Sequence, residues 1–267
     1  MPLLHSFLLG LLQGLTEFIP VSSTAHLLIG QQLLGLPADD AMFSFLVIVQ
    51  LGTLVSLFAF YWKDLLTIAK ATFDFRHPTL ERNLGFYILL ATLPALLAGY
   101  LLKDAVEALF RQPLLEAAIR LLAAATLLTL AEWLTKKSRN LDSMTWLDAL
   151  VIGLFQVISV FPGASRSGTT ISAGMFRGFD RPSAARFAFL MSVPVMLAAG
   201  AYEMLDVLKM PGLTSFLLPL TVGFVTAALV GWLAIRWLIG YLSKHSLYVF
   251  AAYCAVLGLI VLVFHIF

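Results

Sequence analysis

The chain has 267 residues, of which 60% are hydrophobic and only 12% are charged, and its net charge is +2. A soluble domain of this length could not bury so much apolar surface, so the composition excludes a soluble globular protein and favours an integral membrane protein. The single cysteine, Cys254, excludes an internal disulfide and a cysteine-based metal site. The first basic side chain is Lys63, so the apolar N-terminal stretch lacks the basic region of a signal peptide.

The first apolar stretch, residues 3–35, is interrupted by Pro20 and by the hydroxyl cluster that follows it. Proline ends helices, and the backbone groups that it frees are tolerated at membrane depth only inside protein or beside a water-filled cavity. We therefore expect a re-entrant helix-loop-helix hairpin here. Three uninterrupted apolar segments, approximately 41–62, 84–102 and 114–134, follow and are long enough to cross a hydrocarbon core about 30 Å thick.

The same order recurs in the second half of the chain. Residues 146–176 are interrupted by Pro162-Gly163 and by Ser165-Arg166-Ser167, which predicts a second re-entrant hairpin. Three further predicted spans follow, approximately 183–205, 213–236 and 246–266. The expected fold is thus an all-α polytopic membrane protein with six transmembrane helices and two re-entrant hairpins.

Internal likeness indicates duplication within one integral membrane domain covering residues 1–267. The segment from Gln13 to the serines after Pro20 resembles Gly153-Leu-Phe-Gln156 followed by Pro162-Gly-Ala-Ser, and the segment around Pro94 resembles that around Pro194. Repeat 1 would cover about 1–134 and repeat 2 about 146–267. One hairpin and three spans per repeat invert the second repeat relative to the first, so the two hairpin tips can meet near the midplane.

The distribution of basic residues orients this topology. Twelve of the 17 Lys and Arg residues fall on one side and three on the other, and the positive-inside rule makes the basic side cytoplasmic. The N-terminus, the C-terminus and the mouth of the first hairpin are therefore expected outside. The second hairpin would enter from the cytoplasm.

The first hairpin carries the most informative side chain. Glu17 lies in an otherwise apolar run, where a carboxylate costs about 2.5–3.5 kcal/mol and is read as functional by default. Gln13 lies one helical turn earlier on the same face, and the two oxygen donors suit Mg²⁺ or Ca²⁺. Alternatives are an interhelical hydrogen bond for Gln13 and a structural ion pair with a buried arginine for Glu17.

Polar groups on either side of the two breaks complete the candidate site. His26 lies three residues after Ser23, a spacing that allows the Ser–His contact that activates a hydroxyl nucleophile, although either group could be purely structural. Arg166 offers a planar fork matched to phosphate oxygens, and the glycines and half-helix amides around it also favour phosphate. The expected substrate-binding groups, some of which could equally be helix caps, are Ser22, Thr24, Gly163, Ser165, Ser167, Gly168 and Thr170.

These residues resemble the motifs of the undecaprenyl-diphosphate phosphatase family, also known as the bacitracin-resistance proteins. The first motif reads Gln13-Gly-Leu-Thr-Glu17-Phe-Ile-Pro-Val-Ser-Ser-Thr-Ala-His26, and the second reads Pro162-Gly-Ala-Ser165-Arg166-Ser167-Gly-Thr-Thr170. Two departures are Gln at position 13, where many relatives carry Glu, and Ala at position 25, where Gly is common. The first weakens the expected metal site and the second restricts the hairpin turn.

The resemblance implies a bacterial inner-membrane enzyme with an outward-opening site. It would cleave the terminal phosphate from undecaprenyl diphosphate and return undecaprenyl phosphate to peptidoglycan synthesis. In the expected mechanism, Glu17 and Gln13 hold the cation, Arg166 neutralises phosphoryl charge, and Ser23 attacks with His26 as base, or else water attacks directly. The rival prediction is a polyprenyl-phosphate flippase that uses the same anion site.

The expected partners follow from the same site. They are a polyprenyl diphosphate lipid and the surrounding membrane lipids, with a homodimer as an open alternative and no nucleic acid.

Overall fold

The computed structural model describes residues 1–37, 39–74, 77, 79–102, 113–159, 165–209 and 213–266. Regular structure within these residues is helical, apart from one isolated bridge between Arg139 and Phe179. The helices are α1 (Leu3–Phe18), α2 (Ser23–Leu33), α3 (Asp40–Phe73), α4 (Leu80–Leu101), α6 (Pro113–Leu134), α7 (Trp146–Ile158), α8 (Arg166–Phe176), α9 (Arg181–Val207), α10 (Leu213–Leu242) and α11 (Tyr248–Ile266), with a 3-10 turn at Leu141–Ser143.

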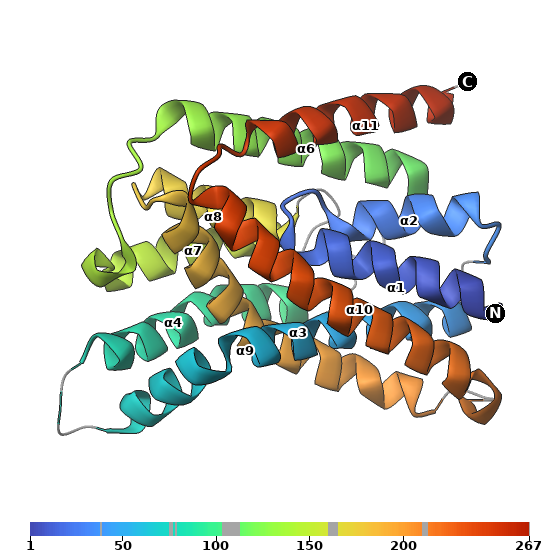
Figure 1. Ribbon diagram of the computed structural model, residues 1–267, viewed down its shortest axis with the longest axis horizontal. Helices are drawn as coiled ribbons and strands as arrows, with labels where there is room; N and C mark the ends of the chain where they lie inside the picture. Colours follow the sequence, from blue (N-terminus) through green and yellow to red (C-terminus); the bar gives the residue numbers. More distant parts are fainter. Residues whose placement is uncertain are drawn as a thin grey trace.

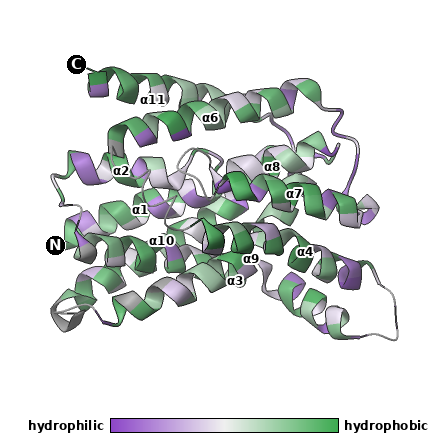
Figure 2. Cartoon of the chain, turned by 180° about the vertical axis from the view of Figure 1, so that it is seen from behind, coloured by the Kyte–Doolittle hydropathy of each residue, from purple (hydrophilic) through white to green (hydrophobic). Residues whose placement is uncertain are grey.

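Six of these helices, α3, α4, α6, α9, α10 and α11, are long and apolar enough to cross a membrane, which confirms the predicted spans. Figure 2 shows hydrophobic residues along most of their length. The one clear difference is α3, which continues beyond the predicted end at residue 62, through a kink at Tyr61, to Phe73. Hydropathy drops at Lys63 and Asp64, but these side chains do not break a helix, so the helix outlasts its apolar part.

The two interrupted stretches form two helix pairs, α1–α2 and α7–α8, in the same register. The first helices begin at residues 3 and 146 and the second helices at 23 and 166, so both starts are 143 residues apart. Both second helices have 11 residues and a serine at the N-cap. This register supports the predicted duplication, which stays a prediction, as does re-entry into a bilayer.

The likeness around Pro94 and Pro194 does not follow the register. Pro94 lies in α4, the second long helix of its half, whereas Pro194 lies in α9, the first long helix of the other half. That likeness therefore does not mark equivalent positions, and it reflects the recurrence of Ala, Leu and Pro in apolar helices.

Each helix pair packs against a long helix from the other half of the chain. Helix α1 lies along α10, and α7 lies along α4 (Figure 1). Glycine permits both approaches: a Cβ on Gly14 would lie 2.9 Å from the Ala227 carbonyl oxygen, and one on Gly153 would lie 2.5 Å from the Ala91 carbonyl oxygen. The halves are thus interlocked, which brings the two interrupted stretches together.

The chain termini lie at one end of the molecule, and the basic segment 135–145 lies at the opposite end (Figure 1). This arrangement agrees with termini on one side of a membrane and a positively charged loop on the other. Which side faces the cytoplasm stays a prediction.

Candidate active site at the junction of the two helix pairs

The end of α1 and the start of α8 meet inside the protein. Ser167 Oγ, in the first turn of α8, donates to the carbonyl oxygen of Ile19, which directly follows α1, over 3.4 Å. A cavity of about 10 Å³ lies beside this junction, and its polar lining is Glu17, Arg166, Ser167, Thr170 and Ser192. A space of this size holds about one water molecule. The site is therefore polar, small and shared by both halves.

Three side chains at the junction donate hydrogen bonds to the carboxylate of Glu17. Gln13 Nε2 donates to Glu17 Oε2 over 2.9 Å, and Ser23 Oγ donates to the same oxygen over 2.7 Å. The guanidinium of Arg166 donates to Glu17 Oε1 in a direct ion pair. The structure thus confirms two expectations: Gln13 and Glu17 share one helix face, and Glu17 and Arg166 meet across a shared cavity. The structural alternative for Glu17, an ion pair with a buried arginine, is also observed, whereas the hydrogen bond of Gln13 stays within α1 and is not the interhelical bond considered for it.

His26 is held by two partners, and neither is Ser23. Its Nδ1 lies 2.8 Å from the Ser22 carbonyl oxygen, and its Nε2 lies 2.8 Å from the Tyr253 hydroxyl. The expected Ser–His contact is therefore wrong for this structure, in which Ser23 donates to Glu17 instead. The reason is geometric: the imidazole folds back along its own helix turn to the carbonyl four residues earlier.

Among the other predicted hydroxyl residues, Ser165 and Thr170 bond to the backbone of α8, whereas Ser22 does not cap α2. Ser165 caps α8 by accepting from the Gly168 amide over 3.1 Å, and Thr170 donates back to the Arg166 carbonyl oxygen over 2.7 Å. Ser22 holds the N-cap position of α2 with a left-handed φ of 67° and no side-chain cap, and Thr24 is exposed. Gly163 lies outside the described residues.

A divalent cation would find few protein ligands here. The described residues contain no group of three or more His, Cys, Asp or Glu side chains that could hold a metal. Glu17 supplies one carboxylate, and Gln13 turns its amide nitrogen toward that carboxylate. Such a set fits Mg²⁺ or Ca²⁺ only if substrate phosphate and water provide most of the ligands, as is common for Mg²⁺.

Helix α11 contributes residues that sequence reasoning missed. Tyr253 lies 227 positions from His26, and the next residue, Cys254, directs its thiol toward the Pro20 carbonyl oxygen over 4.0 Å. No local motif links an apolar C-terminal helix to a histidine near the N-terminus. The contact depends on the packing of α11 against the break between α1 and α2, which is a tertiary feature.

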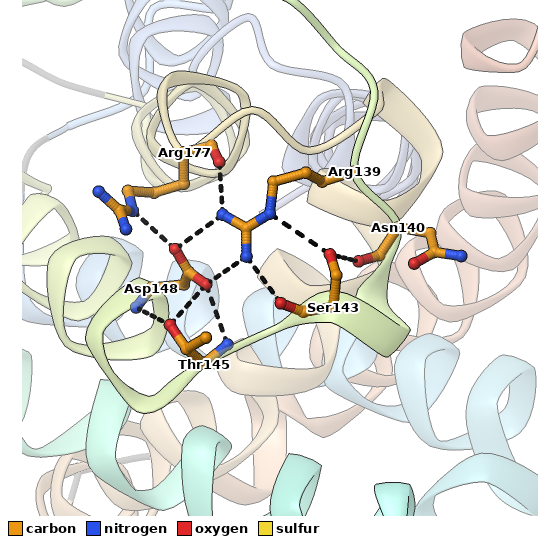
Figure 3. Close-up of polar contacts among 6 residues, drawn as sticks. All are labelled: Arg139, Asn140, Ser143, Thr145, Asp148 and Arg177. Atoms are coloured by element: carbon orange, nitrogen blue, oxygen red, sulfur yellow. Dashed lines mark hydrogen bonds and ion pairs between the residues drawn. The ribbon is translucent and has the colours of Figure 1, made fainter.

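A second polar cluster closes the far end of the α7–α8 pair (Figure 3). The fully buried carboxylate of Asp148, at the start of α7, accepts from Arg139 over 2.7 Å and from Arg177, at the end of α8, over 2.7 Å. Burial alone would raise the pKa of Asp148, but hydrogen bonds from Arg139, Thr145 and Arg177 outweigh it and hold that pKa well below its usual range. This cluster ties the two ends of the pair together.

Comparison with known proteins identifies the family of the chain. Residues 6–260 match the family model described as bacitracin resistance protein BacA. A protein from Mycobacterium marinum named undecaprenyl-diphosphatase is 38% identical, with 96% of this chain and 92% of the relative aligned.

Two further relatives, from Anaeromyxobacter sp. and Rubrobacter xylanophilus, carry the same name and are each 41% identical. The alignments cover 95% and 94% of this chain and 88% and 94% of the relatives. The chain therefore belongs to the bacitracin resistance protein BacA family.

Proposed function

We propose that the protein hydrolyses undecaprenyl diphosphate to undecaprenyl phosphate and inorganic phosphate. This reaction recycles the lipid carrier for peptidoglycan synthesis and confers resistance to bacitracin. The observation that carries the proposal is the meeting of Glu17, Ser23 and Arg166 at the junction of two broken helix pairs. A carboxylate, a hydroxyl and a guanidinium at one buried point match the needs of phosphoryl transfer.

Ser23 is the proposed nucleophile, and Glu17 is the proposed acceptor of its proton. Ser23 Oγ already donates to Glu17 Oε2, which supports this direction of transfer. Attack forms a bond from Oγ to the terminal phosphorus and breaks the bond from that phosphorus to the bridging oxygen, which leaves with undecaprenyl phosphate. Water then cleaves the phosphoserine, with His26 as the proposed acid-base group for this second step. Direct attack by water on the diphosphate is the alternative.

Arg166 is the proposed electrostatic partner of the transferred phosphoryl group. Its fork matches two phosphate oxygens, and Ser22, Thr24, Ser165, Ser167, Gly168 and Thr170 are the proposed neighbours that supply hydroxyls and amides. Because Arg166 is paired with Glu17 and the cavity is only about 10 Å³, a diphosphate can enter only by displacing this pair. Substrate binding would then release the Glu17 carboxylate at the moment when it is needed.

A divalent cation, Mg²⁺ or Ca²⁺, is proposed to bind at Glu17 with help from Gln13. When bound, it would neutralise diphosphate charge and polarise the phosphoryl oxygens.

The direct test is phosphate release from the purified protein in detergent, with undecaprenyl diphosphate as substrate. We expect release that a chelator suppresses and that Mg²⁺ or Ca²⁺ restores. The variant Glu17→Gln should lose turnover while folding normally, because the amide cannot accept the Ser23 proton. An absence of release with every divalent metal would reject the enzyme and favour the rival lipid flippase. Retained turnover in Glu17→Gln would reject the role of Glu17 in both metal binding and proton transfer.

A trapping experiment separates the two nucleophiles. Rapid acid quenching with substrate labelled in the terminal phosphate should leave label on Ser23, and Ser23→Ala should abolish both label and turnover. Turnover without any labelled protein would assign the attack to water.

The protein spans the membrane several times, and its orientation and assembly are proposals that accompany the function. We propose that both termini and the active site face the outside of the bacterial inner membrane. Alkaline phosphatase fused to the C-terminus should then be active in cells, because this reporter folds only outside the cytoplasm. The proposed homodimer is tested by the mass of the purified protein in detergent.

A further inference from the structure

Helix α11 reaches the candidate active site through one side chain. Tyr253 is about half-exposed, yet its hydroxyl lies 2.8 Å from His26 Nε2, and the two rings are nearly parallel, at 9°. The adjacent Cys254 faces the Pro20 carbonyl oxygen. Two consecutive residues of α11 therefore contact both sides of the first break, one before α2 begins and one within its first turn.

The hydrogen bonds of His26 define the protons on its ring. A backbone carbonyl oxygen only accepts, so Nδ1, which faces the Ser22 carbonyl oxygen, must carry a proton. In the neutral ring Nε2 then holds the lone pair, and the Tyr253 hydroxyl donates to it. Nε2 is thus the ring nitrogen that can take up a proton, and the Tyr253 hydroxyl occupies its lone pair in this structure.

We infer that Tyr253 is a positioning residue for the reaction, which orients His26 by holding its Nε2 lone pair from the second half of the protein. This inference rests on the proposed function. Neither Tyr253 nor His26 lines the cavity shared by Glu17 and Arg166, and Tyr253 would act through the proposed acid-base role of His26, which its hydroxyl contacts. The two halves would then each support the other's chemistry: α8 brings Arg166 to Glu17, and α11 brings Tyr253 to His26.

The central variant is Tyr253→Phe, which keeps the ring stacked on His26 and removes only the hydroxyl. A catalytic group released from its orienting bond loses rate without losing substrate affinity, so kcat should fall about ten-fold while KM stays close to the wild-type value. The matched control is Tyr248→Phe on the same helix, where the tyrosine is 45% exposed, against 47% for Tyr253. This control should keep the wild-type kcat.

A double-mutant cycle separates positioning from general stability. In a His26→Ala background, Tyr253→Phe should cause no further loss of the residual rate, because its only route to the chemistry is gone. An equal loss in both backgrounds, a change mainly in KM, or an unchanged kcat in Tyr253→Phe would overturn the inference. Thermal unfolding of each variant confirms that the rates come from folded protein.

A readout that needs no activity tests the contact itself. With ¹⁵N-labelled histidine, the chain shows five imidazole side chains, and His26→Gln identifies the signal of interest. Tyr253→Phe should move the Nε2 resonance of His26 and leave the other four unchanged. A moved resonance in a protein that releases no phosphate would reject the proposed function but keep the Tyr253–His26 pair. An unmoved resonance in an active enzyme would reject the pair alone.

Discussion

The two helix pairs share a register and each carries a charge at its tip, but they differ at the base, where the first helix of the pair begins and the second ends. In α7–α8 the base is charged, because Asp148 links Arg139 and Arg177 there. The residues 143 positions earlier than Asp148 and Arg177 are His5 and Leu34, so the base of α1–α2 has no such ion pair. The tip of α1–α2 instead carries the carboxylate Glu17. In the proposed mechanism, α7–α8 thus serves as a fixed support for Arg166, and α1–α2 carries the other reactive groups.

A pair of glutamines makes the contrast sharper. Gln13 and Gln156 occupy the same register position and are each 1% exposed. Gln13 donates to Glu17, four positions later, whereas the sequence has a valine four positions after Gln156. Both amide atoms of Gln156 lack a hydrogen-bond partner in the structure as described. The carboxylate, and not the shared helix geometry, thus distinguishes the proposed reactive pair from the other.

The largest effect should come from the tip of α7–α8. Replacing Arg166 with alanine removes the only guanidinium that faces Glu17 in the described structure, and loss of such a charge stabiliser lowers kcat by about 10²–10³. Arg166→Lys should recover part of the rate, since lysine keeps the charge but not the planar fork. The control is Arg186→Ala, which breaks a largely exposed pair with Asp64. Equal kcat in Arg166→Ala and the control would show that the two tips do not form one site.

Much of this contrast could be predicted from the sequence, but not all of it. Apolar length located the six spans, and the breaks at Pro20 and around Ser165 located both helix pairs. The Glu17–Arg166 meeting followed from treating the halves as inverted copies. The partner of His26 could not be predicted, because Ser23 is only one of three hydroxyl residues within four positions of the histidine in the sequence. Tyr253 is brought there by helix packing that no spacing rule encodes.

The base of α7–α8 should control stability and leave the chemistry unchanged. Asp148→Asn removes the charge between two arginines whose side chains are about a third exposed and can regain water. Breaking a buried ion pair costs about 3–5 kcal/mol. Because both arginines are partly exposed, we expect Asp148→Asn to lower the unfolding free energy by about 3 kcal/mol, at the lower end of this range. Thermal unfolding in detergent measures it, with the exposed Asp142→Asn as control. A kcat that falls as far as in Arg166→Ala would contradict the division between base and tip.

The pH dependence of this cluster has a defined sign. The pKa of Asp148 is lowered in the folded protein, so its contribution to stability is present above the unfolded pKa, about 3.9, and is lost as pH falls through the lower folded value. The difference in melting temperature between wild type and Asp148→Asn should therefore stay constant from about pH 7 to pH 5. It should shrink only below about pH 4. A difference that already disappears near neutral pH would show that the carboxylate is not held in its charged form.

Smaller effects are expected at the two glycines where α1 packs on α10 and α7 packs on α4. Gly14→Ala would press a methyl group on the α10 backbone, and Gly153→Ala would do the same on α4, so each should lose about 1–3 kcal/mol of stability. Only Gly14→Ala should also lower kcat, because it displaces the helix face that carries Gln13 and Glu17. Gly240→Ala, which meets no atom within 4 Å, serves as control and should gain about 0.5–1 kcal/mol. Unfolding curves and phosphate release separate the two effects.

The smallest expected effect comes from Gln156. Its buried amide has lost contact with water and gained no partner, so Gln156→Leu should raise the unfolding free energy by about 1 kcal/mol and leave kcat unchanged. The matched change Gln13→Leu removes the donor to Glu17 Oε2 and should lower kcat with little gain in stability. If Gln156→Leu also slows phosphate release, the second pair contributes an amide to substrate binding, and the assignment of all reactive groups except Arg166 to the first pair is wrong. If it changes neither quantity, the amide is solvated in the membrane-embedded protein and its burial carries no cost.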